Sequence, residues 1–202
     1  MSKTILKVVS SFRGDQSASN ALADAIVAKL LSENEGAKVE VRDVSKGMAH
    51  LDAQLFTAFI TPEADRTEDQ KAAVAVSDAM IEELFKADYL VIGVPMYNFT
   101  IPSVLKSWLD HVARANVTFK YTESGAVGLV EDTKAYLAIA TGGIYTDAAN
   151  APYDFTESYL KATLAFIGVT DVETFRAEGM AIPDLAEGAV DKAIKTVEAF
   201  SF

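Results

Sequence analysis

The most informative segment of this chain is Tyr89-Leu90-Val91-Ile92-Gly93-Val94, which runs directly into Pro95-Met96-Tyr97-Asn98-Phe99-Thr100-Ile101-Pro102. The first part is almost continuously apolar, as is typical of a strand buried on both faces of a parallel sheet. Because proline cannot donate a hydrogen bond to a sheet, we expect the strand to stop at Pro95, and Pro102 suits the first turn of a following helix. The segment between the prolines therefore lies at the carboxyl end of a central strand, where open α/β sheets bind their ligands.

The loop between these prolines carries a methionine, two aromatic residues and an asparagine. A loop that only connects two elements has little use for exposed apolar rings, so we interpret Met96, Tyr97, Asn98 and Phe99 as a platform for a flat ligand. The alternative is that Met96, Tyr97 and Phe99 simply pack beneath the following helix, as apolar side chains commonly do.

Strand-like and helix-like segments alternate along the rest of the chain. Leu22, Ile26 and Leu30, for example, recur every four residues, as the buried face of an amphipathic helix requires. The expected strands cover residues 5–9, 38–43, 89–94, 134–140 and 169–177, and the expected helices cover about 20–35, 51–60, 67–85, 102–112, 153–166 and 185–202. Residues 117–130 are predicted to form a β-hairpin that leaves the main fold. This pattern predicts the α/β class: a doubly wound, five-stranded parallel sheet of flavodoxin-like order, with helices on both faces, in a single domain over residues 1–202.

The composition is that of an ordinary globular chain with a strong excess of acidic residues. Of its 202 residues, 50% are hydrophobic and 23% are charged, and the formal net charge is −11. That charge would repel the phosphates of nucleic acids and anionic lipids, so neither is an expected partner. The chain contains no cysteine, which excludes disulfides and thiol catalysis, and its first residues lack the apolar core of a signal peptide. We therefore expect a soluble cytoplasmic protein without a membrane-spanning segment.

Three serines in the first strand-to-helix loop form a candidate phosphate site. Ser10 follows the first strand, and Ser17 and Ser19 stand at the start of the next helix. Free N–H groups and the positive end of a helix dipole bind phosphate at such a point, and hydroxyl groups add donors. The alternative is ordinary helix capping by one of the serines. The chain has neither a GxxxxGKS/T nor a GxGxxG motif, so a P-loop and a dinucleotide-type turn are both excluded.

Gly142 and Gly143 follow the fourth expected strand and would let the backbone approach a ligand closely, although paired glycines also make ordinary turns. All three candidate loops fall at carboxyl ends of strands, so they should converge on one edge of the sheet.

His50 and His111 are far apart in the sequence, His111 is expected to be structural, and no metal site or catalytic triad is indicated. A bound cofactor that carries its own chemistry fits this set of residues best.

Four runs of residues resemble the FMN-dependent NADH:azoreductases, a family also described as FMN-dependent NADH:quinone oxidoreductases. These runs are the serine-rich first loop, Pro95-Met96-Tyr97-Asn98-Phe99, Arg114-Ala115-Asn116-Val117-Thr118-Phe119-Lys120-Tyr121-Thr122 and Phe166-Ile167-Gly168-Val169-Thr170-Asp171. The resemblance extends over essentially the whole chain, and the second and third runs are specific to this family. It implies a flavodoxin-like homodimer that reduces azo dyes and quinones with NADH or NADPH.

The same resemblance implies the residues of the site. Ser10, Ser17 and Ser19 would bind the FMN phosphate, and the loop from Met96 to Phe99 would line and hydrogen-bond the isoalloxazine ring. The full implied cofactor set is Ser10, Ser17, Ala18, Ser19, Pro95, Met96, Tyr97, Asn98, Phe99, Ala140, Thr141, Gly142 and Gly143, and the implied substrate pocket is Phe119, Tyr121 and Tyr145. Many members read Ser-Arg-Gly-Gly where this chain has Ala140-Thr141-Gly142-Gly143, which leaves open what replaces the serine and arginine side chains.

The implied reaction needs no catalytic side chain, because the flavin carries the chemistry in a two-electron ping-pong cycle. A hydride passes from the reduced nicotinamide to the flavin N5, and a quinone or azo compound then takes the place of the nicotinamide and receives the electrons. The alternative is a flavodoxin-like carrier that passes electrons to a protein partner, since an acidic surface would suit a basic redox protein. A hydrolase is disfavoured because no nucleophile constellation is present.

The working unit is expected to be a two-fold dimer in which the partner chain completes the pocket. Phe119 and Tyr121 fall on one side of the predicted hairpin, and Trp108 lies in the helix after the proline-bracketed loop. Such aromatic residues are favoured at interfaces and costly to expose in a monomer. The alternative is that the hairpin folds back on its own domain.

Overall fold

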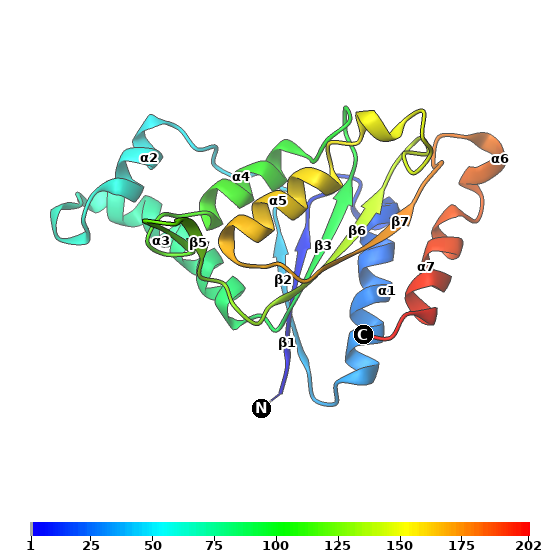
Figure 1. Cartoon of the computed structure of the whole chain (residues 1–202), viewed down its shortest axis with the longest axis horizontal. Helices are drawn as coiled ribbons and strands as arrows, with labels where there is room; N and C mark the ends of the chain where they lie inside the picture. The colour runs from blue at the N-terminus through cyan, green and yellow to red at the C-terminus, as the bar shows by residue number, and fades with distance from the viewer. Residues whose placement is uncertain (1) are drawn as a thin grey trace.

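The structure, a computed structural model that describes residues 2–202, contains a five-stranded parallel sheet and a separate two-stranded hairpin (Figure 1). The sheet strands are β1 (Thr4–Val9), β2 (Lys38–Asp43), β3 (Tyr89–Pro95), β6 (Lys134–Ala140) and β7 (Val172–Ala177), and the hairpin strands are β4 (Phe119–Thr122) and β5 (Gly125–Gly128). The helices are α1 (Ala18–Glu33), α2 (Ala53–Ile60), α3 (Glu68–Lys86), α4 (Ser103–Val112), α5 (Glu157–Ile167), α6 (Pro183–Ala186) and α7 (Ala189–Ala199). The spatial order β2-β1-β3-β6-β7 confirms the predicted doubly wound fold of flavodoxin-like order.

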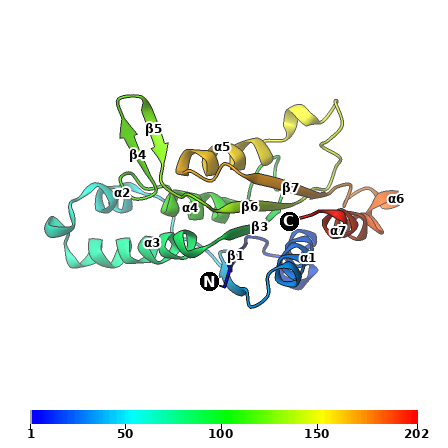
Figure 2. The ribbon, with the colours of Figure 1, turned by 60° about the horizontal axis from the view of Figure 1, so that its bottom comes forward.

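Strand β3 lies at the centre of the sheet because its side chains are buried on both faces. Leu90, Ile92 and Val94 belong to one apolar core and Val91 to the other, as the alternation of strand side chains requires. The first core lies under α3, α4 and α5, and the second lies under α1 and α7 on the opposite face (Figure 2). These two cores hold β3 between β1 and β6, so the loop that follows β3 leaves from the middle of the sheet edge.

Three helices begin at capping side chains. The hydroxyl of Ser17 and the carboxylate of Asp52 each accept a hydrogen bond from the backbone three residues later, at the starts of α1 and α2. Thr67 and Gln70 form a reciprocal capping box at the start of α3. The capping box at Thr67 agrees with the helix expected from residue 67, and the cap at Ser17 fixes where α1 begins relative to the end of β1.

Two expected boundaries near the sheet edge differ from the structure. Strand β3 includes Pro95 as its last residue, a position at which a missing N–H group is tolerated. The helix expected from Tyr153 begins instead at Glu157, because Pro152 lies in a short 3-10 turn over Ala151–Tyr153. This delay leaves a longer connection between β6 and α5 at the carboxyl edge of the sheet.

The C-terminal elements are also shorter than expected. The last strand begins at Val172 rather than Val169. The helix expected over residues 185–202 is divided into α6 and α7, because Gly188 adopts a left-handed conformation with a φ of 88°.

The longest helix, α3, has 19 residues and mixes charged with apolar positions. Among the helices that the structure describes between residues 2 and 202, none has the length and apolar character needed to cross a membrane.

The predicted hairpin is confirmed, with β4 and β5 paired antiparallel. It packs against the C-terminal end of α5, where Leu129 N donates to the Ile167 carbonyl at 3.0 Å. A Cβ atom on Gly128 would lie 2.1 Å from Gly168 N, so only glycine permits this approach. The base of the hairpin is therefore fixed to its own chain, while the strands project away from the sheet (Figure 2).

The aromatic residues expected at a subunit interface have different surroundings. Trp108 is fully buried in the core under α4, so the expectation that it serves an interface is wrong. Phe119 is buried against Phe166, with ring centroids 4.3 Å apart, which agrees with a hairpin that folds back on its own chain. Tyr121, by contrast, is 73% exposed.

Candidate functional site

The carboxyl ends of β1, β3, β6 and β7 meet at one edge of the sheet, and the segments that follow them enclose a cleft of about 280 Å³. The predicted convergence of the three loops is therefore present. The walls of the cleft are Ser11, Arg13, Gln16, Ser17, Ala18 and Ser19 from the first loop, Pro95, Met96 and Tyr97 from the second, Ala140, Thr141 and Gly142 from the third, and Met180 and Ala181 after β7. The predicted site residues Ser10, Asn98, Phe99 and Gly143 lie next to these walls in the sequence but do not line the cleft.

The first loop brings two hydroxyl groups to the N-terminus of α1. Ser17 Oγ and Ser19 Oγ lie 3.0 Å apart, and both residues are buried. The first N–H groups of a helix have no hydrogen-bond acceptor within the helix. Here the hydroxyl of Ser17 accepts a hydrogen bond from the N–H group of Asn20. The N–H groups of Ala18 and Ser19, the two hydroxyls and the positive end of the α1 dipole therefore form a donor-rich corner of the cleft with the chemistry that an anion requires.

Ser10 lies behind this corner. Its hydroxyl donates to the Gly93 carbonyl at 2.7 Å, and its side chain is buried. Helix α1 packs closely on the sheet at Gly93, because a Cβ atom at this position would lie 3.2 Å from the side chain of Asn20. Ser10 thus connects β1 to β3 and supports the position of α1, while its hydroxyl is already used within the protein.

The second loop closes on itself as a tight turn. Tyr97 N donates to Thr100 O at 2.9 Å and Thr100 N donates to Tyr97 O at 3.2 Å, and between them Asn98 and Phe99 have φ values of 50° and 72°. Two successive positive φ values are typical of type I′ turns and are costly for a phenylalanine. Phe99 is 51% exposed, with its ring centroid 6.0 Å from that of Tyr153. Phe99 therefore does not pack beneath the following helix.

Tyr97 is held in place by the first loop. Its ring stacks on that of Phe12 with centroids 4.7 Å apart and an interplanar angle of 25°, and its hydroxyl lies 3.4 Å from Ser11 Oγ. Phe12 itself is 73% exposed. The first and second loops therefore contact each other through an aromatic pair at the rim of the cleft.

A second cavity, of about 890 Å³, adjoins the cleft, because Met96 and Tyr97 line both. The start of α4 and Tyr159 of α5 form much of its remaining wall. Lys106 also lines it and pairs with Asp110 at 2.6 Å. Although partial burial lowers the pKa of Lys106, the bond to Asp110 raises it overall, so this side chain stays a cation at the cavity wall.

The third loop is held to the segment after β7 by backbone hydrogen bonds. Thr141 N donates to Ala177 O at 3.0 Å, and residues 180 and 181 return two further hydrogen bonds to the loop. Thr141 Oγ1 donates to Gly143 O at 2.8 Å, so this side chain serves the loop itself. Gly142 borders the cleft, and Gly143 lies against the ring of Tyr145.

The predicted substrate-pocket residues do not come together within one chain. Tyr145 lies just after the third loop and is partly buried. Phe119 and Tyr121 lie at the C-terminal end of α5, whereas the cleft lies near its N-terminal end, and the eleven residues of α5 span roughly 16 Å. Neither ring lines the cleft or the adjoining cavity in the chain as described from residue 2 to residue 202.

Several residues of the cleft and of the adjoining cavity were not singled out from the sequence. Ser11, Phe12, Arg13 and Gln16 belong to the first loop, in which only the serines at 10, 17 and 19 were selected for their hydroxyls. The segment of Met180 and Ala181 follows β7, and the rule that carboxyl ends of parallel strands share one edge applied to it as well. Position after a strand was therefore a better signal than residue type.

Both histidines lie away from the cleft. His111 is buried, its Nε2 lies 3.1 Å from the carbonyl oxygen of Ala49, and burial lowers its pKa. His50 Nδ1 lies 3.0 Å from Ser107 Oγ. The structural role expected for His111 agrees with these contacts.

Known proteins resemble this chain along almost its whole length. A family model described as Flavodoxin-like fold matches residues 3–200. An FMN-dependent NADH:quinone oxidoreductase of Beijerinckia indica subsp. indica is 44% identical over 196 residues, which cover 96% of this chain and 97% of that protein. The crystal structure of an azoreductase from Bacillus anthracis str. Sterne has a TM-score of 0.87 at 31% identity, and the match covers 98% of this chain and 100% of that chain. An FMN-dependent NADH-azoreductase from Bacillus anthracis str. Ames Ancestor, solved in complex with FMN, has a TM-score of 0.86 at 27% identity over 98% of this chain and 97% of that chain.

Proposed function

Because this chain belongs to the family of proteins with a flavodoxin-like fold, we propose that it is an FMN-dependent oxidoreductase that uses NADH or NADPH to reduce quinones and azo compounds. The observation that carries the proposal is the cleft at the carboxyl edge of the sheet. There the donor-rich corner of Ser17 and Ser19 and the wall of Met96 and Tyr97 belong to one continuous surface. The names of the relatives support the choice of donor and acceptor.

The residues present fit a flavin mononucleotide. Two hydroxyls 3.0 Å apart at a helix N-terminus offer the donors that a phosphate needs, and Arg13 adds a cation to the same cleft. The second loop offers flat apolar surface to a ring, and the third loop offers backbone from Ala140 to Gly142. We assign Ser17, Ala18 and Ser19 to the phosphate, supported from behind by Ser10, and residues 95–99 and 140–143 to the ring.

When FMN is bound, it supplies two-electron redox chemistry between the nicotinamide donor and the acceptor, so no side chain has to form a bond to substrate. The protein contributes position and the exclusion of water. The side chain of Asn98 offers both a donor and an acceptor for the polar edge of the ring. Because the Thr141 hydroxyl is bonded to Gly143 O, the third loop offers the ring its backbone rather than this side chain.

The oxidation of NADH by the purified holoprotein tests this proposal, with menadione as the quinone and methyl red as the azo compound. We expect acceptor-dependent oxidation without any added protein, loss of the rate when FMN is removed, and recovery when FMN is restored. The same titration with NADPH identifies the preferred donor. A protein that holds FMN but reduces neither acceptor until a second redox protein is added would be an electron carrier, and the proposed enzymatic function would be wrong.

We further propose that the whole chain acts as one domain in a cytoplasmic homodimer. The hairpin projects from the sheet and carries the exposed ring of Tyr121 away from its own cleft, which suits a contact across a two-fold axis. In this arrangement Tyr121 would complete the pocket of the partner chain, Phe119 would support it from beneath with ring centroids 5.5 Å apart, and Tyr145 would come from the chain that holds the flavin. A cytoplasmic location is proposed because reduced nicotinamide is supplied there.

A further inference from the structure

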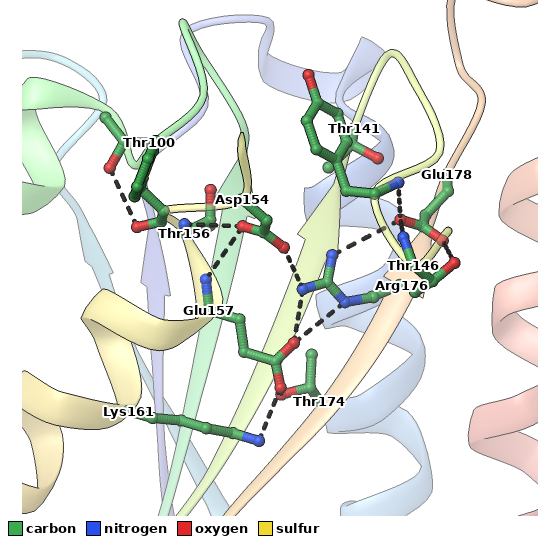
Figure 3. Close-up of polar contacts among 12 residues, drawn as sticks. Thr100, Thr141, Thr146, Asp154, Thr156, Glu157, Lys161, Thr174, Arg176 and Glu178 are labelled. Carbon is green, nitrogen blue, oxygen red and sulfur yellow. Dashed lines mark hydrogen bonds and ion pairs between the residues drawn. The ribbon is translucent and has the colours of Figure 1, made fainter. Parts of the chain in front are cut away.

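A cluster of charged side chains lies beside the cleft, at the carboxyl end of β7 (Figure 3). Arg176 Nη2 donates to Asp154 Oδ2 and to Glu157 Oε2, at 2.6 Å in both cases, and Arg176 Nη1 lies 3.7 Å from Glu178 Oε1. The side chains of Arg176, Asp154 and Glu178 are 14%, 9% and 15% exposed. The three carboxylates come from the segment before α5, from the first turn of α5 and from the segment after β7. One guanidinium therefore joins three separate parts of the chain.

Through Asp154 this cluster reaches the strained turn of the second loop. Asp154 Oδ1 accepts a hydrogen bond from the backbone N–H two residues later, at 2.8 Å, which fixes the segment between them. Within that segment, Phe155 N donates to Phe99 O at 3.0 Å, and Phe155 O accepts from Thr100 Oγ1 at 3.3 Å. Consecutive positive φ values persist only where the surroundings restrain the backbone. The pair of Asp154 and Arg176 supplies such a restraint from outside the loop.

Through Glu178 the cluster also reaches the segment that follows the third loop. Glu178 Oε1 accepts from Tyr145 N at 2.8 Å and from Thr146 N at 3.2 Å. Glu178 Oε2 accepts from Thr146 Oγ1 at 2.6 Å. These bonds fix the chain just beyond Gly143, including Tyr145, which is assigned above to the substrate pocket.

We propose that Arg176 is a positioning residue, which holds the second and third loops of the cleft in place through Asp154 and Glu178. The inference rests on the proposed function, because it assigns these two loops to the flavin ring. Arg176 touches neither the cleft nor the adjoining cavity, so its effect on the site is indirect.

The charge balance of the cluster supports this role. Without the guanidinium, Asp154, Glu157 and Glu178 would lose the cation they share, and Lys161, which bonds Glu157 at 2.7 Å, would offset only part of their charge. Partly buried carboxylates that are grouped around one cation repel one another when that cation is removed. A lysine cannot replace the arginine fully, because one ammonium group lacks the planar fork that contacts two carboxylates at once.

Hydrogen exchange of the full chain, measured by mass spectrometry on peptides that cover residues 97–100 and 144–156, tests the proposal in Arg176→Met. Every acceptor of the Phe155, Tyr145 and Thr146 amides is still present in this variant, so faster exchange there reports lost positioning. We expect faster exchange in both peptides, unchanged exchange in α1, and a loss of about tenfold in affinity for FMN and riboflavin alike, because preorganisation of the ring site is lost. Arg176→Lys should recover part of the protection.

A matched control is Arg114→Met, which removes another buried guanidinium. Arg114 is 6% exposed and bonds Asp78 at 2.5 Å and Ser77 at 3.0 Å, both on α3 rather than on either loop. Exchange at residues 97–100 should stay at the wild-type level in this control. If Arg176→Met does not fold, Asp154→Ala and Glu178→Ala each remove one connection, and the first should accelerate exchange at 97–100 while the second should not.

Equal exchange at residues 97–100 in Arg176→Met and Arg114→Met, or wild-type affinity for both flavins in Arg176→Met, would overturn the positioning role. These results are distinguishable from a failure of the proposed function. If the wild-type chain bound neither FMN nor riboflavin, the assignment of the cleft would be wrong, whereas the exchange data would still report whether Arg176 restrains the loops.

Discussion

Among individual residues, Asn98 and Phe99 show where the chain departs most from relaxed geometry. Four non-glycine residues between positions 2 and 202 have positive φ values, and these two are consecutive. Asparagine tolerates a left-handed conformation through its short polar side chain, but phenylalanine does so at a cost. The strain lies in the loop that we assign to the flavin ring, and it is accompanied by hydrogen bonds from Phe155 and between Tyr97 and Thr100. The strained conformation gives the loop a defined shape at the ring site, and the surrounding hydrogen bonds hold it there.

The two hydroxyls at the start of α1 lead to a prediction about cofactor selectivity. We expect the double variant Ser17→Ala/Ser19→Ala to lose roughly 1–3 kcal/mol of FMN binding, the range for hydrogen bonds to a charged group. Riboflavin has no phosphate, so its affinity should remain near that of the wild type. Fluorescence titrations of both flavins measure the ratio of the two affinities, which is the informative quantity.

Loss of the Ser17 cap also weakens α1 itself, by about 1 kcal/mol. Thr67→Ala removes an equivalent cap from α3, away from the cleft, and serves as the control. The control should lose stability without changing the ratio of FMN to riboflavin affinity. If the serine variant keeps the wild-type ratio, its hydroxyls act only as helix caps.

At the scale of elements, the alternation of strands and helices could be predicted because it depends on local patterns. The apolar run from Tyr89 and the four-residue repeat from Leu22 each identify their element without reference to distant residues. The edge at which the loops converge followed from the same alternation. The boundaries that were wrong, at Glu157 and around Gly188, depend on turn geometry that no periodicity records.

The position of the hairpin could not be predicted, because it depends on one contact between distant glycines. Gly128 and Gly168 are forty residues apart in the sequence numbering, and their close approach sets where β4 and β5 leave the fold. The sequence likewise cannot distinguish a core aromatic residue from an interface one. Trp108 and Tyr121 looked equivalent, yet one is fully buried and the other is mostly exposed.

The contacts of Glu157 on α5 with Arg176 and Thr174 on β7 should make the stability of the fold depend on pH. Burial alone would raise the pKa of Glu157, but hydrogen bonds from Lys161, Arg176 and Thr174 lower this pKa from 4.5 to about 2. Below pH 4.5 the unfolded chain therefore binds a proton more readily than the folded chain does, and stability falls as the pH falls towards 2. We expect this group to account for roughly 2 kcal/mol of the stability lost between pH 7 and pH 3.

Urea unfolding of the wild type and of Glu157→Gln at these two pH values measures the effect. The variant should be less stable at pH 7 and should lose less stability on acidification. Glu68→Gln is the matched control, because Glu68 is also the first residue of a helix but its side chain is 89% exposed. A wild-type pH dependence in Glu157→Gln would show that other carboxylates control the acid transition.

For the whole molecule, the remaining question is which surfaces a second copy covers. Tyr121 is 73% exposed on the hairpin, and on α2 Phe56 and Ile60 are 53% and 63% exposed. Scattered apolar residues are normal on a protein surface, but a projecting hairpin that carries an exposed ring is well suited to a self-complementary two-fold contact. The acidic net charge of −11 opposes association, so such a contact has to bury enough apolar surface to offset it.

We expect light scattering across a dilution series to give about twice the chain mass of 21.7 kDa. The variant that tests the shared pocket is Tyr121→Ala, which should raise the Michaelis constant for menadione with little loss of stability, because the ring is exposed in the single chain. Phe119→Ala is less informative, since Phe119 packs on Phe166 and its truncation would cost about 3–5 kcal/mol of stability.

Phe85→Ala is a suitable control for this variant, because Phe85 is 47% exposed on α3 and lines neither cavity. It should leave the Michaelis constant for menadione unchanged. A fully active monomer would contradict the dimer and the shared pocket together. If the protein is a dimer but Tyr121→Ala keeps the wild-type Michaelis constant, the assembly is correct and the hairpin lies outside the partner's pocket. The two measurements therefore test the dimer and the shared pocket separately.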